Sequence, residues 1–489
     1  PARAMARQLT ALREQARRLR ARRRAVAGGG GLAFAFATHF ADVAADGFGL
    51  VVGNPPWVRP HRVPAPVRVA LRARFTAARH AAWTEGAEAA GAGAGFAAQA
   101  DLAALFVERA ASLLRPGGAL ALLVPAKLWR ALAGGGVRRL LACETRLHRL
   151  EDWTASPPGF DAAVYPSLVV ATRPCPEHAT AACVEVVDHA PSGRRRWAIP
   201  SVALPLSSDP ASPWPLVPPE VRAAFERLRD AGPPLVQLLG RPELGVKTGC
   251  NAAFVVTTGE DDDPCPVTSG DGRRGLVERA LLRPALRGET VRAWCAHAGA
   301  ERLVWTHDDV GARTRLPPHA HRWLLHWRPR LIGRADARGR AAWWSLFRTD
   351  AADARRTRVV WGDFGRRPRA LVLPAGDPTV PLNSCYVLPC DDPRDAHALA
   401  ALLNGPLAAA WLDVVAEPAR GGWRRYLAWT VAWLPLPRAW PAARDELAEL
   451  ALRASAGAPP ADAELLETAL RAYGVEGSTM APLLAWGAR

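Results

Sequence analysis

The sequence predicts an α/β fold in which strands alternate with helices, followed by a second region of mixed α+β structure. Three adjacent segments carry this prediction. Residues 48–54, FGLVVGN, form a short apolar run that is typical of a buried strand. Residues 100–118, ADLAALFVERAASLLRPGG, repeat apolar residues at helical spacing and end in Pro-Gly-Gly, and residues 119–126, ALALLVPA, are apolar throughout. A strand, a helix and a strand in this order indicate a parallel sheet.

The segments around this unit set the limits of the first predicted domain. Residues 1–31 contain an arginine-rich helix that stops at a run of four glycines, Gly28 to Gly31, and we expect this segment to be a linker. Residues 32–197 form the predicted α/β domain. Three further strand-like runs lie in its later part, at residues 147–153, 165–173 and 182–190.

The rest of the chain divides into three segments of different composition. Residues 198–236 are rich in proline and serine, which predicts a linker between domains. Residues 237–437 mix short strand-like runs with tryptophans and dense arginines, which predicts a separate α+β domain. Residues 438–489 are rich in alanine and predict two helices from Trp440 onward. A chain of 489 residues, of which 49% are hydrophobic, is long enough for two or three domains.

The charge balance favours an acidic partner. The chain has 63 basic and 46 acidic residues and a formal net charge of +17, so nucleic acid is the first expectation and an anionic membrane surface the second. Lysine occurs only as Lys127 and Lys247, and nearly all of the positive charge is arginine. Because alanine is also abundant, biased codon usage explains part of this composition, and the net charge alone does not identify a partner.

Cysteine spacing and hydropathy exclude several classes of protein. The eight cysteines include no Cys-x-x-Cys pair and no spacing with histidine that is typical of a zinc site, so we predict no metal site and reduced thiols. No uncharged apolar run reaches the length of ~20 residues that a membrane-spanning helix needs. We therefore expect a cytoplasmic protein that has no membrane partner. Because the chain begins with Pro1, we also expect it to be part of a longer chain.

The tetrapeptide Asn54-Pro55-Pro56-Trp57 follows the first predicted strand directly. An exocyclic amine on an aromatic base is a poor nucleophile because its lone pair is delocalised, and two acceptors on its N–H groups draw that lone pair back onto nitrogen. The Asn54 amide oxygen and the Pro55 carbonyl suit this task, the prolines hold both acceptors in place, and Trp57 would stack on the base. The alternative is an ordinary turn after a strand with a tryptophan in the core.

Beyond the tetrapeptide, the chain resembles the adenine-N6 DNA methyltransferases of the gamma arrangement. The likeness is to the long, type IIG-like enzymes of restriction-modification systems and their phage-defence relatives. Residues 39–59, HFADVAADGFGLVVGNPPWVR, resemble the entry into the catalytic motif, although Gly49 stands where aspartate is usual. Residues 105–130 resemble the next helix and strand, and residues 159–170, GFDAAVYPSLVV, resemble a later motif. Further segments, such as LGVKTGCNAAFVV and ALLNGPLAAAWL, continue the resemblance to residue 437.

This resemblance implies a Rossmann-like class I methyltransferase sheet, of which the C-terminal half is visible, followed by a target-recognition domain. It also implies S-adenosylmethionine as the cofactor. Asn54, Pro56, Leu102 and Phe106 would contact one side of this cofactor, with Phe106 near its adenine. Phe160 would pack on the second face of a flipped target adenine, opposite Trp57.

The other half of the cofactor site is not recognisable in this sequence. It requires a glycine-rich turn after a strand and an acidic residue for the ribose hydroxyls, and neither precedes Asn54. Residues 91–96, GAGAGF, have suitable glycines for a permuted arrangement, but no apolar strand comes before them. We therefore expect an upstream N-terminal portion or a separate subunit to supply this half.

The second domain predicts double-stranded DNA as the partner, because arginines contact phosphates and a few side chains contact base edges. Most of its tryptophans should lie in the core. Lys247, Thr248 and Asn251 form a polar cluster that faces either the DNA or the catalytic cleft. Three other functions stay open: methylation of RNA bases, methylation of a protein glutamine amide, and a non-catalytic DNA-binding or specificity fragment.

Overall fold

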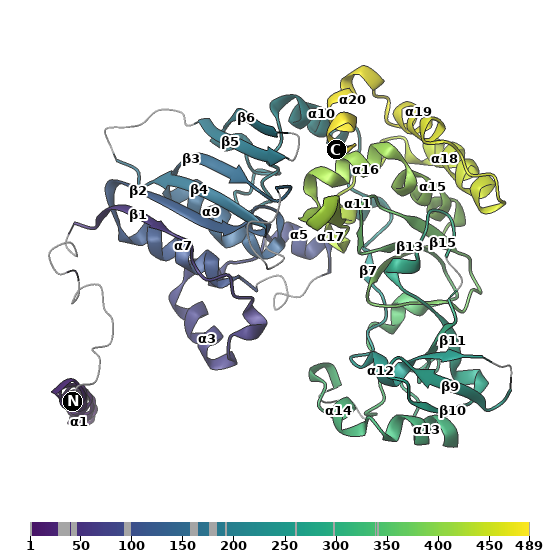
Figure 1. Ribbon diagram of the computed structural model, residues 1–489, viewed down its shortest axis with the longest axis horizontal. Coiled ribbons are helices and arrows are strands. Elements are labelled where there is room, and N and C mark those ends of the chain that lie inside the picture. The colour runs from purple at the N-terminus through teal and green to yellow at the C-terminus, as the bar shows by residue number, and fades with distance from the viewer. Residues whose placement is uncertain are drawn as a thin grey trace.

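The computed structural model describes residues 2–27, 40, 46–91, 99–156, 165–175, 183–190, 193–259, 262–296, 299–337, 339 and 342–488. Helix α1, Ala2–Ala27, is helical as predicted. The remaining elements form several mixed sheets with helices packed against them, which agrees with a mixed α/β class (Figure 1). One six-stranded sheet lies in the first half of the described chain. The second half contains three further sheets, of six, four and three strands.

The first sheet has the strand order β1-β2-β4-β3-β5-β6. Its strands are β1 Phe48–Gly53, β2 Leu114–Pro125, β3 Arg146–Asp152, β4 Pro166–Thr172, β5 Cys183–Ala190 and β6 Gly193–Pro200. β1 is parallel to β2 and β3 is parallel to β5, but β4 is antiparallel to both of its neighbours and β6 is antiparallel to β5. The expectation of a parallel sheet is therefore correct for two pairs and wrong for three. Helices carry the chain between β1 and β2, as a parallel pair requires, whereas the connection from β5 to β6 is too short for a crossover.

The junction between α7 and β2 also differs from the expectation. Helix α7, Leu102–Leu113, is followed at once by β2, so the Pro-Gly-Gly sequence lies inside the strand instead of ending the helix. Gly117 has a φ of 75°, and a Cβ on Gly118 would lie 2.6 Å from the Phe48 carbonyl oxygen. Glycine therefore lets β2 approach β1 closely at this irregular point of the sheet.

The two faces of the first sheet have different surroundings. On the covered face, α7 and α9, Gly135–Glu144, pack on buried residues such as Leu120, Leu122 and Val169 in one apolar core. On the open face, Leu50 and Val52 of β1 are 61% and 69% exposed. The half-buried residues next to them on the open face are Ala121 and Leu123 of β2 and Leu168 and Val170 of β4. Within the described part of the chain, no helix covers this apolar half of the open face (Figure 1).

The segment between β1 and α7 forms short helices and packs against the C-terminal part of the chain. It contains a 3-10 turn, Pro60–Arg62, and helices α3 Ala65–Arg74, α4 Thr76–Arg79 and α5 Thr84–Ala89. Trp83, just before α5, is fully buried, with its ring centroid 5.8 Å from that of Trp429 and 4.9 Å from that of Trp433. Trp429 belongs to helix α17, Ala428–Ala432, and Trp433 follows this helix directly. The first half of the chain is thus joined to the C-terminal half by an aromatic cluster.

Residues 198–236, which the composition predicts to be a linker, are folded against both halves of the molecule. Leu204, Trp214 and Leu216 lie in the core of the first sheet, whereas Leu206 and Val217 lie in the core of the C-terminal half. Helices α10, Pro219–Arg229, and α11, Leu235–Leu238, complete the segment. The proline and serine content therefore predicts neither the burial of this segment nor its two helices.

A lobe with its own apolar core follows. Its sheet has the order β10-β9-β8-β12-β11-β16. The lobe's elements are α12 Asn251–Phe254, β8 Val255–Thr258, β9 Cys265–Ser269, β10 Arg274–Val277, β11 Leu282–Leu286, β12 Glu301–Val304, α13 Pro318–Leu325, α14 Arg328–Ile332 and β16 Val380–Pro381. Buried residues from Val246 to Ala352, with Val380 and Leu382, form this core. Several of the tryptophans predicted to lie in the core do so, including Trp323 and Trp327.

The C-terminal half shares one large core with Trp83 and α10. Its main sheet, β15-β13-β17-β7, contains β7 Glu243–Leu244, β13 Thr357–Gly362, β15 Ala370–Leu373 and β17 Cys385–Cys390. The helices are α15 Pro393–Asn404, α16 Pro406–Val415, α17, α18 Trp440–Ser455, α19 Asp462–Tyr473 and α20 Gly477–Gly487. Three helices therefore follow Trp440 where the sequence predicts two. A small sheet, β14-β19-β18, consists of β14 Phe364–Gly365, β18 Glu417–Ala419 and β19 Trp423–Arg425.

Neither a single membrane-crossing helix nor a metal-binding cluster occurs in the residues that the structure describes. No single helix there is both long and apolar enough to cross a membrane. Helices α15 and α16 reach that length and apolar character only as a pair, and this pair is bent by 71°. No group of three or more His, Cys, Asp or Glu side chains in the same residues could hold a metal ion.

Candidate functional site

Asn54, Pro55, Pro56 and Trp57 lie where the sequence predicts them, directly after the end of β1. The Asn54 side chain is exposed, Pro55 is buried and Pro56 is exposed. β1 and β2 are parallel, so this segment lies at the same edge of the sheet as the carboxyl end of β2. Ligands of open α/β sheets bind at that edge.

Two hydrogen bonds fix the tetrapeptide to the neighbouring elements. The Trp57 Nε1–H donates to the carbonyl oxygen of Leu123 on β2 over 3.3 Å. The backbone N–H of Leu102, at the start of α7, donates to the Val58 carbonyl over 3.1 Å. Because the prolines restrict φ on one side and these bonds hold the other, the backbone from Asn54 to Val58, with the Pro55 carbonyl, has a defined position before any ligand arrives.

A buried ion pair that sequence reasoning missed lies beside the tetrapeptide. Asp101 caps α7 by accepting from the Ala103 N–H over 3.1 Å, and its second oxygen accepts from the Lys127 Nζ over 2.8 Å. The carboxylate is buried, while Lys127 is partly exposed. This pair ties α7 to the segment after β2. An aspartate directly before an apolar helix is a recognisable cap signal, but its contact with Lys127 exists only in the folded sheet.

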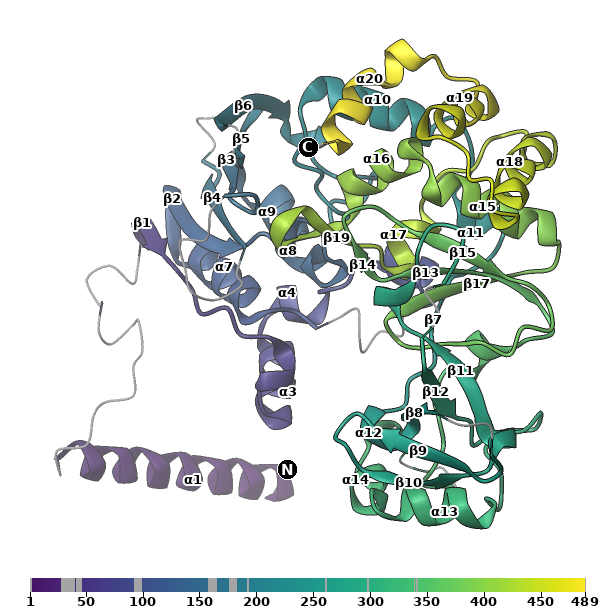
Figure 2. The ribbon, with the colours of Figure 1, turned by 45° about the vertical axis from the view of Figure 1, so that its right-hand side comes forward.

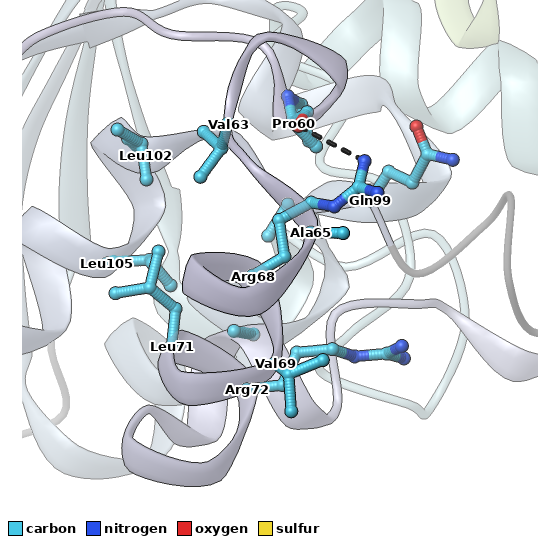
Figure 3. Close-up of a pocket in the computed structure, with 12 residues that line it drawn as sticks. Pro60, Val63, Ala65, Arg68, Val69, Leu71, Arg72, Gln99, Leu102 and Leu105 are labelled. Atoms are coloured by element: carbon cyan, nitrogen blue, oxygen red, sulfur yellow. Dashed lines mark hydrogen bonds between the residues drawn. The ribbon is translucent and has the colours of Figure 1, made fainter.

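The structure separates the two predicted cofactor contacts on α7. Leu102 and Leu105 line a cavity of about 310 Å³ between α7 and α3, together with Val63 and Leu71 (Figure 3). Phe106 does not line this cavity, and its side chain is 47% exposed. The backbone of Leu102 therefore contacts Val58, the residue after the tetrapeptide, whereas the Phe106 side chain is exposed to solvent outside the cavity.

Arginines are concentrated in the segment that follows the tetrapeptide. Residues 59–79 include six arginines and no carboxylate. Arg68 and Arg72 of α3 lie at the rim of the cavity, and the Arg68 guanidinium donates to the Pro60 carbonyl over 3.4 Å (Figure 3). This patch was not predicted from the sequence, although a run of arginines without acidic residues is its signal. Helix α3 contains no acidic residue, and such an excess of positive charge suits an anionic polymer.

Three of the segments singled out by sequence cannot be compared with the structure. Phe160 lies outside the described residues, as do Gly28 to Gly31. The glycine-rich segment 91–96 is described only at Gly91.

The predicted DNA-binding cluster is placed on the lobe, with unequal roles for its members. Lys247 is exposed and forms an ion pair with Asp336. Thr248 is buried, and its hydroxyl donates to the Asn251 Oδ1 over 2.6 Å and accepts from the Cys250 N–H over 3.1 Å. Thr248 thus shapes the turn, and Lys247 and Asn251 are the members that solvent or a ligand can reach.

Residues 29–160 match the family described as Eco57I restriction-modification methylase. The chain is 27% identical over 428 residues to the Type II methyltransferase M.PaeR7I of Pseudomonas aeruginosa, covering 83% of this chain and 68% of that protein.

Among solved structures, the Type IIL restriction-modification enzyme MmeI in complex with DNA matches with a TM-score of 0.57 and 12% identity. The match covers 89% of this chain and 56% of that one, so the chain spans little more than half of that relative's length. The segment that contains the Asn-Pro-Pro-Trp sequence is therefore similar to the Eco57I restriction-modification methylases, and the chain has a fold similar to that of MmeI.

Proposed function

We propose that this chain is the catalytic and target-recognition portion of a site-specific DNA methyltransferase of a restriction-modification or related phage-defence system. The substrate is double-stranded DNA, and the methyl acceptor is the exocyclic N6 amine of a flipped adenine. The observation that carries the proposal is the rigid Asn54-Pro55-Pro56-Trp57 segment at the carboxyl end of β1, fixed by the Trp57 to Leu123 and Leu102 to Val58 hydrogen bonds. The match of residues 29–160 to restriction-modification methylases supports it.

The residues of the tetrapeptide have separate roles in the proposed reaction. The Asn54 Oδ1 and the Pro55 carbonyl accept the two N–H groups of the adenine amine, which directs the nitrogen lone pair away from the ring. Trp57 stacks on one face of the extruded base, and Phe160 contacts the other face. The two prolines keep both acceptors in position, so little reorganisation is needed when the base enters.

The cofactor we propose is S-adenosylmethionine, which supplies an electrophilic methyl group. The described residues fit one side of it: Asn54 and Pro56 are exposed at the reacting end, and the exposed ring of Phe106 offers a face for the adenine. Leu102 supports this side from the adjacent cavity.

The open face of the sheet supports a second part of the cofactor site. In the described residues β1 is an edge strand, and Leu50 and Val52 on it are largely exposed. By contrast, β3 and β5 carry a charged ladder on the same face, in which Arg149 and Glu185 are paired. Charged strands are stable when they face solvent, whereas an exposed apolar edge strand is typical of a surface that another protein segment covers. We propose that an upstream N-terminal portion or a separate subunit covers the apolar half and holds the ribose and methionine of the cofactor.

Methyl transfer to DNA is the direct test of this function. Tritium-labelled S-adenosylmethionine and unmethylated genomic DNA would be incubated with residues 1–489, and in parallel with the same chain joined to its upstream sequence. We expect labelling only with the extended form, because fixing the sulfonium methyl in line with the amine needs both sides of the cofactor site. Labelling by the short chain would contradict the proposed upstream half. No labelling of DNA by either form would favour a non-catalytic specificity fragment, and labelling of RNA alone would favour the RNA enzyme.

Base flipping can be measured separately with 2-aminopurine at the methylated position. We expect its fluorescence to rise on binding, and Trp57→Ala to weaken capture of the flipped base by ~1 to 3 kcal/mol because one stacked face is removed. Trp57→Phe is the matched control, since it keeps a stacking ring and removes indole quenching. Equal fluorescence in the wild type, Trp57→Phe and Trp57→Ala would exclude Trp57 from the base.

A further inference from the structure

A second, larger groove lies in the C-terminal half, away from the tetrapeptide. Its volume is about 770 Å³, and three segments form it: residues 288–292, residues 362–369 and residues 423–425. We call it the arginine groove. Strands β14 and β19, which contribute to it (Figure 2), belong to the small sheet β14-β19-β18, and β18 packs against helix α8, Lys127–Arg130.

The charges of the arginine groove do not balance. It is lined by five arginines, Arg292, Arg366, Arg367, Arg369 and Arg425, against two carboxylates, Glu289 and Asp363. Arg367 is paired with Asp462 outside the groove, and Arg425 lies 4.0 Å from Asp363. Among the described residues, Arg292, Arg366 and Arg369 form no ion pair, and all three are exposed. Such an excess of arginine favours an anionic ligand with several charges.

An exposed aromatic pair stands in the same groove. The rings of Phe364 and Trp423 are stacked, with centroids 4.8 Å apart and an angle of 23° between their planes. They are 41% and 37% exposed, which is unusual for two large apolar side chains in contact. The Arg425 guanidinium lies 5.7 Å from the centroid of the Phe364 ring. Aromatic faces beside arginines are the arrangement that stacks nucleic-acid bases while the backbone is neutralised.

The backbone holds this pair rigidly and places it near the catalytic half. Phe364 pairs with Arg425 across β14 and β19, and the Arg424 guanidinium binds Asp413 over 2.6 Å. The adjacent strand β18 packs against α8. Burial raises the pKa of Glu417 on β18, and the positive charges of Arg425 and then Lys127 oppose this rise.

We propose that the arginine groove binds one strand of the DNA substrate, with Arg292, Arg366 and Arg369 on phosphates and the Phe364–Trp423 pair against an unstacked base. The inference rests on the proposed function and adds a DNA-binding surface that is separate from Lys247 and Asn251 on the lobe.

Binding of a fluorescein-labelled mixed-sequence duplex to the full chain, followed by anisotropy over a range of salt concentrations, tests the groove. For Arg366→Ala/Arg369→Ala we expect the slope of log K against log salt to fall in magnitude by about two, one for each phosphate that an arginine no longer neutralises. For Phe364→Ala/Trp423→Ala we expect the slope to stay the same and the affinity for a duplex with one unpaired base to fall about tenfold. The control Arg355→Ala/Arg394→Ala removes two exposed arginines elsewhere, each paired with an aspartate, and should keep both values.

The outcomes separate this inference from the proposed function. If the wild-type chain binds DNA and both groove variants bind it with wild-type slope and affinity, the groove assignment is overturned and the DNA partner stands. If the wild-type chain binds no duplex at low salt, the DNA part of the proposed function fails as well. Loss of polyglutamate binding in the groove variants, with DNA binding unchanged, would assign the groove to an acidic peptide and overturn the proposal. Thermal unfolding of each variant checks that these exposed substitutions leave the fold intact.

Discussion

Replacing Asn54 by alanine should lower the rate of methyl transfer by about two to three orders of magnitude, in a form of the protein that contains the whole cofactor site. The substitution removes one of the two acceptors that we propose bind the adenine amine, and the other, the Pro55 carbonyl, would not localise the lone pair alone. Asn54 is exposed and its side chain supports no other part of the fold, so stability and DNA affinity should remain those of the wild type.

The measurement is single-turnover methyl transfer together with DNA binding by anisotropy. Asn54→Gln is a useful companion, because it keeps the amide but moves the acceptor by one methylene, and its rate should also fall. A rate for Asn54→Ala within a few-fold of wild type, at unchanged DNA affinity, would refute the role given to the amide.

Arg138→Met should reduce the free energy of unfolding by about 3 to 5 kcal/mol, because it leaves several buried acceptors without a donor. The Arg138 guanidinium is completely buried and donates to the carbonyl oxygens of Leu128, Ala131 and Ala211 over 2.6 to 3.0 Å. Burial lowers its pKa to about 9, so it stays charged at neutral pH. A Cβ on Gly134 would lie 2.5 Å from Nη1, so a glycine there gives the guanidinium its space.

The neighbouring residue provides a matched control. Arg139 is partly exposed and pairs with Asp209 over 3.1 Å, so Arg139→Met should cost less than about 1 kcal/mol. Urea unfolding of both variants measures the difference. Equal stability of the two variants would show that the carbonyls around Arg138 find other donors.

The sequence predicts the parts of the fold that local pattern determines. β1, α7 and the core of β2 appear where apolar runs and helical spacing place them. The direction of β4 does not follow from its sequence, because alternation of apolar residues is the same in parallel and antiparallel strands. β6 was not predicted as a strand, because its three consecutive arginines, Arg194 to Arg196, interrupt any apolar pattern. These arginines form part of the charged outer portion of the sheet.

The candidate site also has parts that the local sequence predicts and parts that only the fold brings together. Asn54 to Trp57 are contiguous, and their chemistry can be read from four residues. The Asp101 to Lys127 pair and the arginine groove bring together residues that are far apart in the chain, so neither has a local signal. For Thr248, the local sequence suggests an exposed polar residue. In the structure its side chain is buried, and its hydroxyl stabilises a turn through hydrogen bonds to Asn251 and Cys250.

The Trp83 cluster has a consequence for exchanging recognition modules between related proteins. The Trp83 indole packs against Trp429 and Trp433. Replacing everything after the proline-rich segment would therefore remove part of the core that buries Trp83 in the first half of the chain. A transplant limited to residues 246–352 would exchange most of a self-contained core and leave those three indoles together. We therefore expect the lobe to be the part that can be exchanged, whereas the C-terminal helices belong to the structural framework that carries it.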